Sequence, residues 1–355
     1  MKRLKVSILG ASGYGGAELL RRLFQHPLVE VVGIGSRQYE SQPLEACWPQ
    51  FAGLSSLIFE DTATIIEKCD LLFSAAPHGS ATSDVKAALQ SGRKVVDLSA
   101  DFRLRPDTYR YWYKEEMHYP ELYPQAIYGL CELHRQEIYG ANLISNPGCH
   151  TTTANLALAP LAAAGLLGDD IIVNSATGIS GAGRSAKVNN LYSEVNENYV
   201  PYSLAGTHRH TGEIEETLGR VKAMGRQLKT HADFDPVMVS FNPYRAPMTR
   251  GILASCYTKS PDSNISEEKL LDLYQDFYSG EPLIHVSSSL PETKAVFGTD
   301  RCILSVRYDQ RTGHIIALAA TDNLGKGAAG QAVHNFNLMQ GYEESLALIR
   351  QAVWP

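Results

Sequence analysis

The N-terminal third of the chain alternates short apolar runs with stretches of helical periodicity. Four apolar runs are bounded by glycine, proline or charged residues and predict buried strands, at residues 5–9, 29–34, 70–75 and 94–98. Two stretches between them predict helices, at residues 17–25 and 80–90. Strands that alternate with helices are typical of a parallel, doubly wound sheet. We therefore expect a Rossmann-type α/β domain at the N-terminus.

Residues 101–140 break this pattern, because tyrosine, proline and charge dominate there, and we expect an irregular segment with short helices. The regular pattern returns with a predicted strand at 143–145. An Ala/Leu-rich helix is expected to follow at 151–164.

Strands dominate the rest of the chain. Apolar and alternating runs predict them at residues 171–176, 237–241, 252–258, 283–286, 302–308 and 314–320. One long helix is evident among them, at 267–278, and a last helix at 327–340 follows a glycine-rich turn. Many strands with few helices predict a mostly antiparallel sheet in a second, α+β domain. We expect the last helix to pack back on the first domain.

The composition is that of a soluble globular protein. With 355 residues, 44% apolar and 20% charged, the chain is long enough for about two domains. Its net charge of -6 offers no attraction to nucleic acid or to an anionic membrane. No apolar run is long enough to span a bilayer or to serve as a signal peptide. Six scattered cysteines argue against a disulfide framework and fit a cytoplasmic protein.

A glycine-rich turn joins the first predicted strand to the first helix. Gly10, Gly13 and Gly16 recur every three residues, with Gly15 in addition. Glycines permit a tight turn and let a pyrophosphate approach the amides at a helix N-terminus. The turn therefore predicts a dinucleotide site, although its spacing differs from the commoner G-x-G-x-x-G.

The end of the second predicted strand indicates which dinucleotide binds. NAD-binding proteins usually place an acidic residue there, whereas this chain has Ser36 and Arg37. A hydroxyl and a guanidinium suit a 2′-phosphate, so we predict NADP(H). A plain surface arginine is the alternative.

Cys149 follows Pro147-Gly148 and directly precedes the predicted helix at 151–164. A thiol at a helix N-terminus lies at the positive end of the peptide dipoles, which favours its thiolate. Thiolates are the nucleophiles of acyl transfer. The segment therefore predicts a catalytic cysteine, and a small buried cysteine behind a turn is the alternative.

Two histidines and a carboxylate lie together at His208, His210 and Glu213. Histidine titrates near neutrality and is the commonest general acid–base group. No cysteine or third histidine lies near in the sequence, so a zinc site is not expected. The residues alone leave open which histidine acts.

Arginines follow two predicted strands. Arg103 and Arg105 come after the strand at 94–98, whose carboxyl end is expected to line the ligand crevice, and Arg103 is the nearer of the two. Arg184 ends a glycine-rich loop in the second domain. A guanidinium grips phosphate or carboxylate in a two-pronged geometry, so these residues are candidates for substrate binding. Solvated surface arginines are the alternative.

Six motifs occur in order along nearly the whole chain: GASGYGG from Gly10, LSADFRL from Leu98, SNPGCHTT from Ser145, GISGAGR from Gly178, GTHRHTGEI from Gly206 and TDNLGKGAAGQA from Thr321. Together they resemble the N-acetyl-γ-glutamyl-phosphate reductases, a family of arginine biosynthesis related to aspartate-semialdehyde dehydrogenases. Relatives in lysine biosynthesis act on a carrier-protein-bound aminoadipyl phosphate. They tend to lack Asn146-Pro147 and the Ser180–Arg184 loop, so the resemblance favours the arginine branch.

The resemblance implies Cys149 as nucleophile and His208 as acid–base residue, with Tyr202 and Glu213 completing the catalytic set. It implies NADP(H) as cofactor, an acyl phosphate as substrate and no metal. The expected cofactor contacts are Gly10, Ser12, Gly13, Tyr14, Gly15, Ser36, Arg37, Ser74, Pro77, Ser180, Gly181 and Asn323. The expected substrate contacts are Arg103, Arg105, Asn146 and Arg184.

The implied organisation is a Rossmann-type NADP-binding domain at 1–148 and 325–355 and a catalytic and dimerisation domain at 149–324. A homo-oligomer, dimer or tetramer, is expected. Amides beside Cys149 are expected to hold the developing oxyanion, and those after Asp322 could face the cofactor.

The expected chemistry proceeds through a cysteine thioester that is reduced to an aldehyde, with His208 shuttling the proton. An aspartate-semialdehyde or glyceraldehyde-phosphate type dehydrogenase would use the same chemistry and is one alternative. A non-catalytic NADPH-binding regulator is the other.

Overall fold

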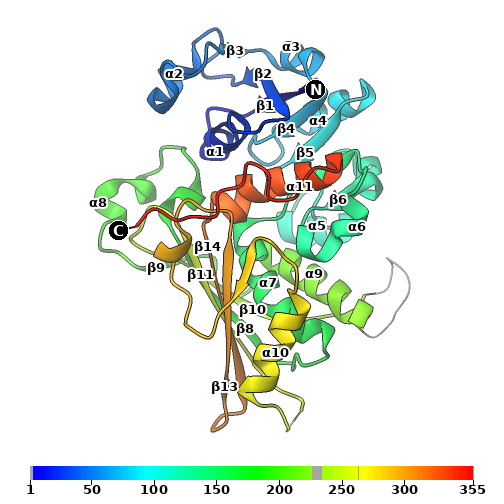
Figure 1. The fold of residues 1–355 in the computed structure, drawn as a ribbon, viewed down its shortest axis with the longest axis vertical. Coiled ribbons are helices and arrows are strands. Elements are labelled where there is room, and N and C mark those ends of the chain that lie inside the picture. The colour runs from blue at the N-terminus through cyan, green and yellow to red at the C-terminus, as the bar shows by residue number, and fades with distance from the viewer. Residues whose placement is uncertain (1–2, 226–233, 263, 355) are drawn as a thin grey trace. The chain divides into compact units, whose positions relative to one another are not determined.

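The computed structural model describes residues 3–225, 234–262 and 264–354, which form two compact units (Figure 1). The described residues of the first unit lie within Met1–Arg110, Glu115–Pro147 and Ala328–Ile349. The second unit holds Tyr111–Lys114, Gly148–Gly327 and the described part of Arg350–Pro355. Residues 111–114, 148, 325–327 and 350–354 thus belong to the second unit, whereas they were expected in the first domain.

The first unit is built on a seven-stranded sheet with the strand order β3-β2-β1-β4-β5-β7-β6. Every neighbouring pair is parallel, which confirms the predicted doubly wound sheet. Its strands are β1 (Leu4–Leu9), β2 (Val29–Gly35), β3 (Phe59–Glu60), β4 (Leu71–Ser74), β5 (Lys94–Asp97), β6 (Ala126–Tyr128) and β7 (Leu143–Ser145). Strand β3 was not predicted, because two residues are too few to show a period. Strand β6 was not predicted because it lies in the segment 101–140, which was expected to be irregular.

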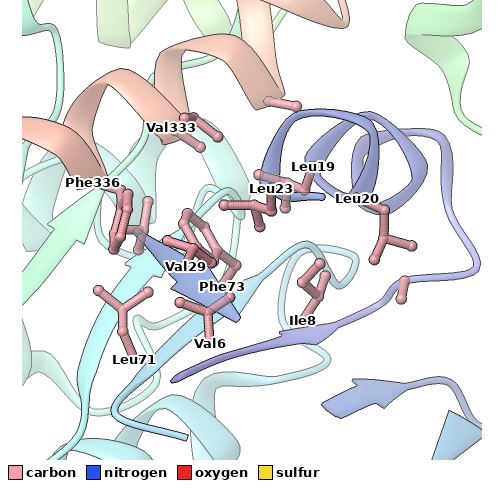
Figure 2. Close-up of a cluster of buried hydrophobic side chains, with 14 of the residues drawn as sticks. Val6, Ile8, Leu19, Leu20, Leu23, Val29, Leu71, Phe73, Val333 and Phe336 are labelled. Atoms are coloured by element: carbon pink, nitrogen blue, oxygen red, sulfur yellow. The ribbon is translucent and has the colours of Figure 1, made fainter. Parts of the chain in front are cut away.

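The helices in this part of the chain are α1 (Tyr14–Leu23), α2 (Leu44–Cys47), α3 (Thr62–Lys68), α4 (Thr82–Gln90), α5 (Pro106–Tyr113), α6 (Cys131–Ile138) and α11 (Gly330–Gln340). Figure 2 shows side chains of α1 and α11 converging over the central strands. Phe73 of β4, Leu19 of α1, and Val333 and Phe336 of α11 are fully buried in this cluster. The last helix therefore packs on the first domain, as predicted.

The second unit contains a mixed sheet with the order β12-β13-β14-β11-β8-β10-β9. Only β8–β10 and β12–β13 are parallel, so the predicted mostly antiparallel sheet is confirmed. Its strands are β8 (Ile171–Thr177), β9 (Val200–Pro201), β10 (Val239–Arg245), β11 (Ile252–Lys259), β12 (Ile284–Val286), β13 (Cys302–Asp309) and β14 (His314–Thr321).

Four helices accompany this sheet: α7 (Cys149–Ala163), α8 (Tyr192–Val195), α9 (His210–Gly225) and α10 (Glu267–Phe277). The buried helix α7 packs against α9 and against β11 and β14. The expectation of one long helix in this part of the chain was wrong, because α9 is also long.

Helix α9 escaped prediction because it contains three glycines, which are poor helix formers. The structure shows why two of them are required. A Cβ on Gly212 would lie 2.2 Å from Nε1 of Trp112, and one on Gly225 would lie 2.1 Å from the carbonyl oxygen of Ala163. Close packing against the neighbouring segments thus requires glycine at these two positions, although glycine lowers the helix propensity. Within the described residues, no helix is long and apolar enough to cross a membrane.

Candidate active site

Cys149 is the first residue of α7, with Gly148 as N-cap. It is partly exposed, whereas the other five cysteines are buried. The first turn of α7 contains no acidic residue, so the peptide dipoles of this helix favour a thiolate there. Cys149 is therefore the one thiol of the chain that combines access with a helix N-terminus.

Glu213 of α9 holds the turn that presents Cys149. Its carboxylate is 2% exposed, and Oε1 accepts the backbone N–H of Gly148 at 2.8 Å. The hydroxyl of Thr151 donates to the same oxygen, also at 2.8 Å. The N–H of Gly148 is thereby occupied, so an oxyanion would have to use amides further into the first turn of α7. Glu213 thus binds the backbone of the turn before Cys149, a contact that the sequence did not indicate.

A second close contact limits the space around Cys149. A Cβ added to Gly327 would lie 2.9 Å from the Cβ of Cys149. Only glycine permits the backbone to approach the nucleophile this closely. Gly327 belongs to a π-helical turn, Gly325–Ala329, that precedes α11.

Tyr202 lies in the loop after β9. Burial, and then the charge of a Cys149 thiolate, raise the pKa of its hydroxyl, which lies 2.9 Å from Nε2 of His150, the residue after Cys149. A raised pKa keeps Tyr202 protonated, so its hydroxyl can serve as a hydrogen-bond donor at neutral pH. Ser203 and Ala205 have positive φ angles of 48° and 56°, so the loop between Tyr202 and His208 holds strained backbone.

His208 packs against Tyr202 and His210, with ring centroids 5.5 and 4.8 Å away. Its Nδ1 accepts the backbone N–H of His210 at 3.1 Å, so in the neutral ring the proton lies on Nε2. Burial, and then the charge of Arg209, lower the pKa of His208 to about 4. His208 is therefore neutral near pH 7 and offers Nε2–H as a donor.

His150, which directly follows Cys149, was not among the residues predicted for the site. The ring is 2% exposed, and hydroxyl groups occupy both of its nitrogens. Nδ1 lies 2.7 Å from Oγ of Ser175, and Nε2 lies 2.9 Å from the hydroxyl of Tyr202. Burial, and then the charge of His208, lower the pKa of His150 to about 3, so it is neutral at physiological pH. Its place beside Cys149 was the only signal in the sequence.

The glycines of the first turn have different structural roles. Gly10 has φ +79°, and a Cβ there would lie 2.6 Å from the backbone of Ala75. A Cβ on Gly16 would lie 2.5 Å from Cα of Ala11. Gly10 thus makes the tight turn and Gly16 the close helix–strand contact, while Gly13 is the N-cap of α1 and leaves its amide end open to an anion.

A pocket of about 390 Å³ opens at the carboxyl ends of β1 and β2 in the first unit. Five of the predicted cofactor residues line it: Gly10, Ser12, Ser36, Arg37 and Pro77. Gly13, Tyr14 and Gly15 do not line this pocket, and Ser74 is fully buried within β4. The lining includes a cation at the end of β2, as a 2′-phosphate would require.

One wall of this pocket is fixed by Asp101. Both oxygens of its carboxylate accept the N–H of Gly79, at 3.0 and 3.1 Å, and Nδ1 of His78 lies 2.7 Å from Oδ1. These contacts hold the loop after β4, from which Pro77 and Ser80 line the pocket. Asp101 thereby connects the end of β5 with the cofactor pocket.

The predicted substrate residues differ in their burial and in the hydrogen bonds of their side chains. Arg103 donates to the carbonyl of Leu98 at 2.8 Å, and Arg105 is exposed. Asn146 is 1% exposed; its amide donates to the carbonyl of Ala328, and its oxygen accepts from Asn335. These bonds favour a structural role for Asn146. Arg184 is exposed in the second unit.

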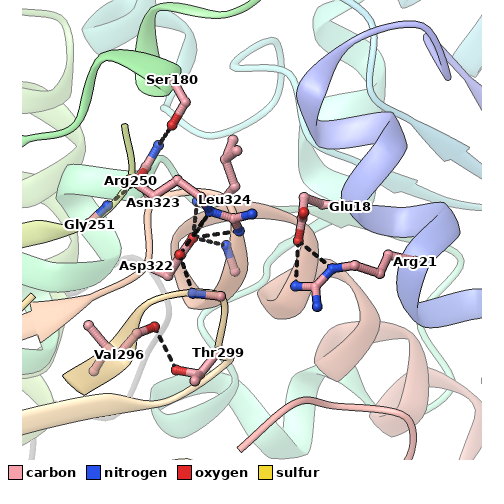
Figure 3. Close-up of polar contacts among 12 residues, drawn as sticks. Glu18, Arg21, Ser180, Arg250, Gly251, Val296, Thr299, Asp322, Asn323 and Leu324 are labelled. Atoms are coloured by element: carbon pink, nitrogen blue, oxygen red, sulfur yellow. Dashed lines mark hydrogen bonds and ion pairs between the residues drawn. The ribbon is translucent and has the colours of Figure 1, made fainter. Parts of the chain in front are cut away.

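Asp322 and Asn323 organise the segment that precedes Gly327 (Figure 3). The carboxylate of Asp322 pairs with Arg250 and accepts N–H groups from Gly298, Leu324 and Gly325. The amides of residues 324–327 are all bonded within the protein, so the expectation that they face the cofactor was wrong.

The other predicted cofactor residues of the second unit lie around Asn323. Its side chain accepts the N–H of Gly251 and donates to Oγ of Ser180, at 2.8 and 2.9 Å. Ser180 is 7% exposed and Gly181 is exposed on the short helix Ile179–Ala182. Contact of these three residues with a cofactor stays a prediction. Across the described chain, no cluster of three metal-ligating side chains is present.

Comparison with known proteins identifies both units. The semialdehyde dehydrogenase NAD binding domain matches residues 5–141, and the semialdehyde dehydrogenase dimerisation domain matches residues 149–323. The N-acetyl-gamma-glutamyl-phosphate reductase of Thermus thermophilus is 49% identical over 350 residues, which cover 99% of this chain and all of the relative. The protein of the same name from Desulforudis audaxviator is 43% identical over 358 residues, covering 99% of this chain and 100% of the relative.

Solved structures show the same fold at much lower identity. Aspartate semialdehyde dehydrogenase II from Vibrio cholerae gives a TM-score of 0.72 at 18% identity, over 95% of this chain and 98% of that one. The aspartate semialdehyde dehydrogenase from Candida albicans, solved with NADP, gives 0.66 at 17% identity, over 96% and 99% of the two chains.

Proposed function

Because the chain belongs to the N-acetyl-gamma-glutamyl-phosphate reductase family, we propose that it reduces N-acetyl-L-glutamyl 5-phosphate to N-acetyl-L-glutamate 5-semialdehyde and phosphate, with NADPH, in L-arginine biosynthesis. The observation that carries this function is the accessible thiol of Cys149 at the start of α7, in a chain 49% identical to such a reductase over its full length.

The first step is acylation of Cys149. Its thiolate attacks the carbonyl carbon of the acyl phosphate, the bond to the phosphate oxygen breaks, and phosphate leaves with the electron pair. The product is a thioester on Cys149. Glu213 holds the Gly148 turn, which keeps the sulfur in place for the attack.

The second step reduces the thioester. NADPH supplies a hydride when bound. As the carbonyl carbon is reduced, negative charge develops on its oxygen, and the protonated hydroxyl of Tyr202 is suited to stabilise it. Nε2–H of the neutral His208 ring donates a second hydrogen bond to that oxygen, and the tetrahedral oxyanion collapses to the aldehyde as the C–S bond breaks. The aldehyde leaves, and Cys149 returns as thiolate.

The NADP(H) preference rests on the pocket in the first unit. Ser36 and Arg37 line it, and Arg37 is placed against the carbonyl of Ser80 at 3.4 Å. A guanidinium there favours the extra phosphate of NADPH over the bare hydroxyl of NADH. The cradle left by Gly10 and Gly16 suits the pyrophosphate of either nucleotide.

We infer a homo-oligomer, because residues 149–323 match a dimerisation domain. Either a dimer or a tetramer fits that match. The six free cysteines, five of them buried, suit the reducing cytoplasm in which we place the reaction.

The deciding experiment is the reverse reaction: phosphate-dependent reduction of NADP⁺ with N-acetylglutamate semialdehyde. Parallel assays use aspartate semialdehyde and a carrier-bound aminoadipate semialdehyde analogue. We expect turnover with the N-acetylglutamate compound only, abolished by Cys149→Ala. Preference for either of the other two aldehydes would contradict the assignment, and absence of turnover with all three would favour a binding protein.

A further inference from the structure

We propose that His150 is a positioning residue: together with Ser175, it turns the hydroxyl of Tyr202 so that the tyrosine proton faces the carbonyl oxygen of an acyl group on Cys149. This inference rests on the proposed function, since it assigns Tyr202 a task in that reaction. The proposed chemistry leaves His150 unused, although no residue lies nearer to Cys149 in the sequence.

The backbone fixes the ring of His150 from two sides. His150 is the second residue of α7, and Ser175 lies in β8, so neither position depends on a loop. The ring is 2% exposed and packs edge-on against Phe241 and His208, with centroids 5.5 and 5.9 Å away. With one hydroxyl at each nitrogen, the ring can neither turn nor exchange its partners with water.

The environment of Ser175 decides which nitrogen carries the proton. Its side chain is fully buried, and Nδ1 of His150 is its only hydrogen-bond partner in the described parts of the chain. If Nδ1–H donated to Ser175, the serine proton would be buried without an acceptor, which is unfavourable. The serine hydroxyl therefore donates to Nδ1, and the ring proton lies on Nε2.

That proton order determines how Tyr202 points. Nε2–H of His150 donates to the tyrosine oxygen at 2.9 Å, so the oxygen is an acceptor in this contact. The proton of Tyr202 is then directed elsewhere, and the Cys149 thiolate is the group whose charge it senses. Donation into the tyrosine oxygen also polarises the O–H bond and strengthens it as a donor.

The neutral state of the ring makes this arrangement durable. A second proton on His150 would displace the donation from Ser175, but burial lowers the pKa of His150 to about 3. The relay from Ser175 through His150 to Tyr202 thus keeps one direction throughout the physiological pH range. An acyl oxygen at Cys149 would meet a donor that needs no reorientation during the reaction.

The variant that tests this role is His150→Phe, which keeps a ring of similar size but removes both nitrogens. His150→Gln restores a donor near the place of Nε2, Ser175→Ala removes the group that sets the tautomer, and His26→Phe is a control that removes another buried histidine. All four are to be compared by melting temperature and NADPH affinity before activity is measured.

We expect His150→Phe to lower kcat about 10- to 100-fold with little change in NADPH affinity, because a misdirected donor loses part of the 10²–10³-fold that a lost donor costs. His150→Gln should recover part of that loss. His150→Phe combined with Tyr202→Phe should be no slower than Tyr202→Phe alone. Losses that multiply in the double variant, or an unchanged kcat in His150→Phe, would overturn the inference.

A second readout separates this inference from the identity of the substrate. p-Nitrophenyl acetate can acylate Cys149: the thiolate attacks the ester carbonyl, the bond to the nitrophenyl oxygen breaks, and nitrophenolate leaves. The burst of nitrophenolate should be slower in His150→Phe than in wild type or His26→Phe. That result, in an enzyme inactive with N-acetylglutamyl phosphate, would refute the proposed substrate alone. Equal rates, or no burst in either protein, would refute the positioning role.

Discussion

At the scale of single residues, Cys149 depends on neighbours that act through the backbone. Glu213 binds the N–H of Gly148, and Gly327 lies against the cysteine Cβ, so neither needs to touch the sulfur to place it. Replacement of the sulfur itself should be specific. Cys149→Ser should lose nearly all turnover and still bind NADPH, because a hydroxyl is a far weaker nucleophile at neutral pH.

Steady-state rates and fluorescence titration with NADPH check this expectation. Cys149 should also react fastest of the six cysteines with iodoacetamide, since the other five are buried. Substantial turnover in Cys149→Ser would rule out the thioester route. Faster alkylation of another cysteine would contradict the accessibility that the structure gives.

The two neighbouring histidines should differ in their contribution to the rate. His208→Asn should slow the reaction about 10²–10³-fold, the range for loss of an oxyanion donor, whereas His210→Asn should keep the backbone N–H that His208 uses and lose much less. Because the pKa of His208 is lowered to about 4, the ring is neutral above that pH and gains a proton below it. The acid limb that depends on His208 should therefore lie near pH 4.

The expectation that this histidine titrates near neutrality neglected the burial of its ring. Single-turnover hydride transfer across pH 3.5–8 measures both points. The reverse ranking of the two variants would assign the hydrogen-bond donor to His210. Equal and small effects would make the histidine cluster structural.

Residue identity and local motif were enough to predict a thiol at the start of a helix and the pocket residues Ser36 and Arg37. The environment of Asn146, the contact of Glu213 with Gly148 and the contacts of His150 were not predictable. Each depends on a partner distant in the sequence, such as Asn335 for Asn146 or Ser175 for His150. A motif names the residue types present, whereas burial and tertiary contacts decide which polar atoms remain free.

At the scale of elements, periodicity predicted every described strand longer than three residues, but it missed the short helices α2, α3 and α8. It also failed at the two-residue strands β3 and β9, at β6 in the irregular segment, and at α9, where Gly212 packs on Trp112. Helix propensity predicts how a segment behaves alone, and close packing overrides it. The glycines of α1 offer a direct test of the same competition.

Gly15→Ala should be neutral or slightly stabilising, because its nearest outside atom lies 4.0 Å from the added Cβ and alanine is the better helix former. Gly16→Ala should destabilise the protein by about 1–3 kcal/mol, because its Cβ would lie 2.5 Å from the backbone of Ala11. Urea unfolding of the two variants makes the comparison. Equal stability would show that β1 and α1 can separate without cost.

The loop after β4 should lose its fixed shape in Asp101→Asn. An amide accepts fewer of the bonds from Gly79 and His78, so the pocket wall that includes Pro77 and Ser80 should loosen. Each charge-assisted bond contributes about 1.5–3 kcal/mol, and the amide replaces part of what is lost. We therefore expect NADPH to bind roughly tenfold more weakly.

Asp107→Asn is the matched control, because that carboxylate is 93% exposed and lies in the following helix, α5. Isothermal titration of both variants with NADPH gives the comparison. Unchanged affinity in Asp101→Asn would mean that the loop keeps its position without the carboxylate.

At the scale of the whole molecule, stability in acid should depend on the carboxylate that anchors the chain after α11. Glu344 accepts a hydrogen bond from His334 at 3.0 Å and two from Arg135 at 2.9 Å. The bond from His334, and then that from Arg135, lower the pKa of Glu344 to about 2. A lowered pKa stabilises the fold above about pH 4.5, and this stabilisation is lost as the pH falls toward 2.

Glu344→Gln should therefore reduce the free energy of unfolding at pH 7 by about 1–3 kcal/mol and much less at pH 3. Glu343→Gln, at an exposed neighbour bonded to Ser345, is the control. Denaturant unfolding from pH 2.5 to 7.5 follows both. A difference from wild type that stays constant with pH would show that the ionised carboxylate is not the source of the stabilisation.

The covalent path of the chain through the two units has a consequence for its synthesis. Val333 and Phe336 complete the core under α1, but they follow the whole of Gly148–Gly327 in the chain. At about 5–20 residues per second, the ribosome needs roughly 10–40 s to translate that stretch. Throughout this interval Leu19 and Phe73 lack their late partners and present an apolar surface that chaperones can bind. The unit that begins first on the ribosome thus completes its core only after residues 148–327 have been translated.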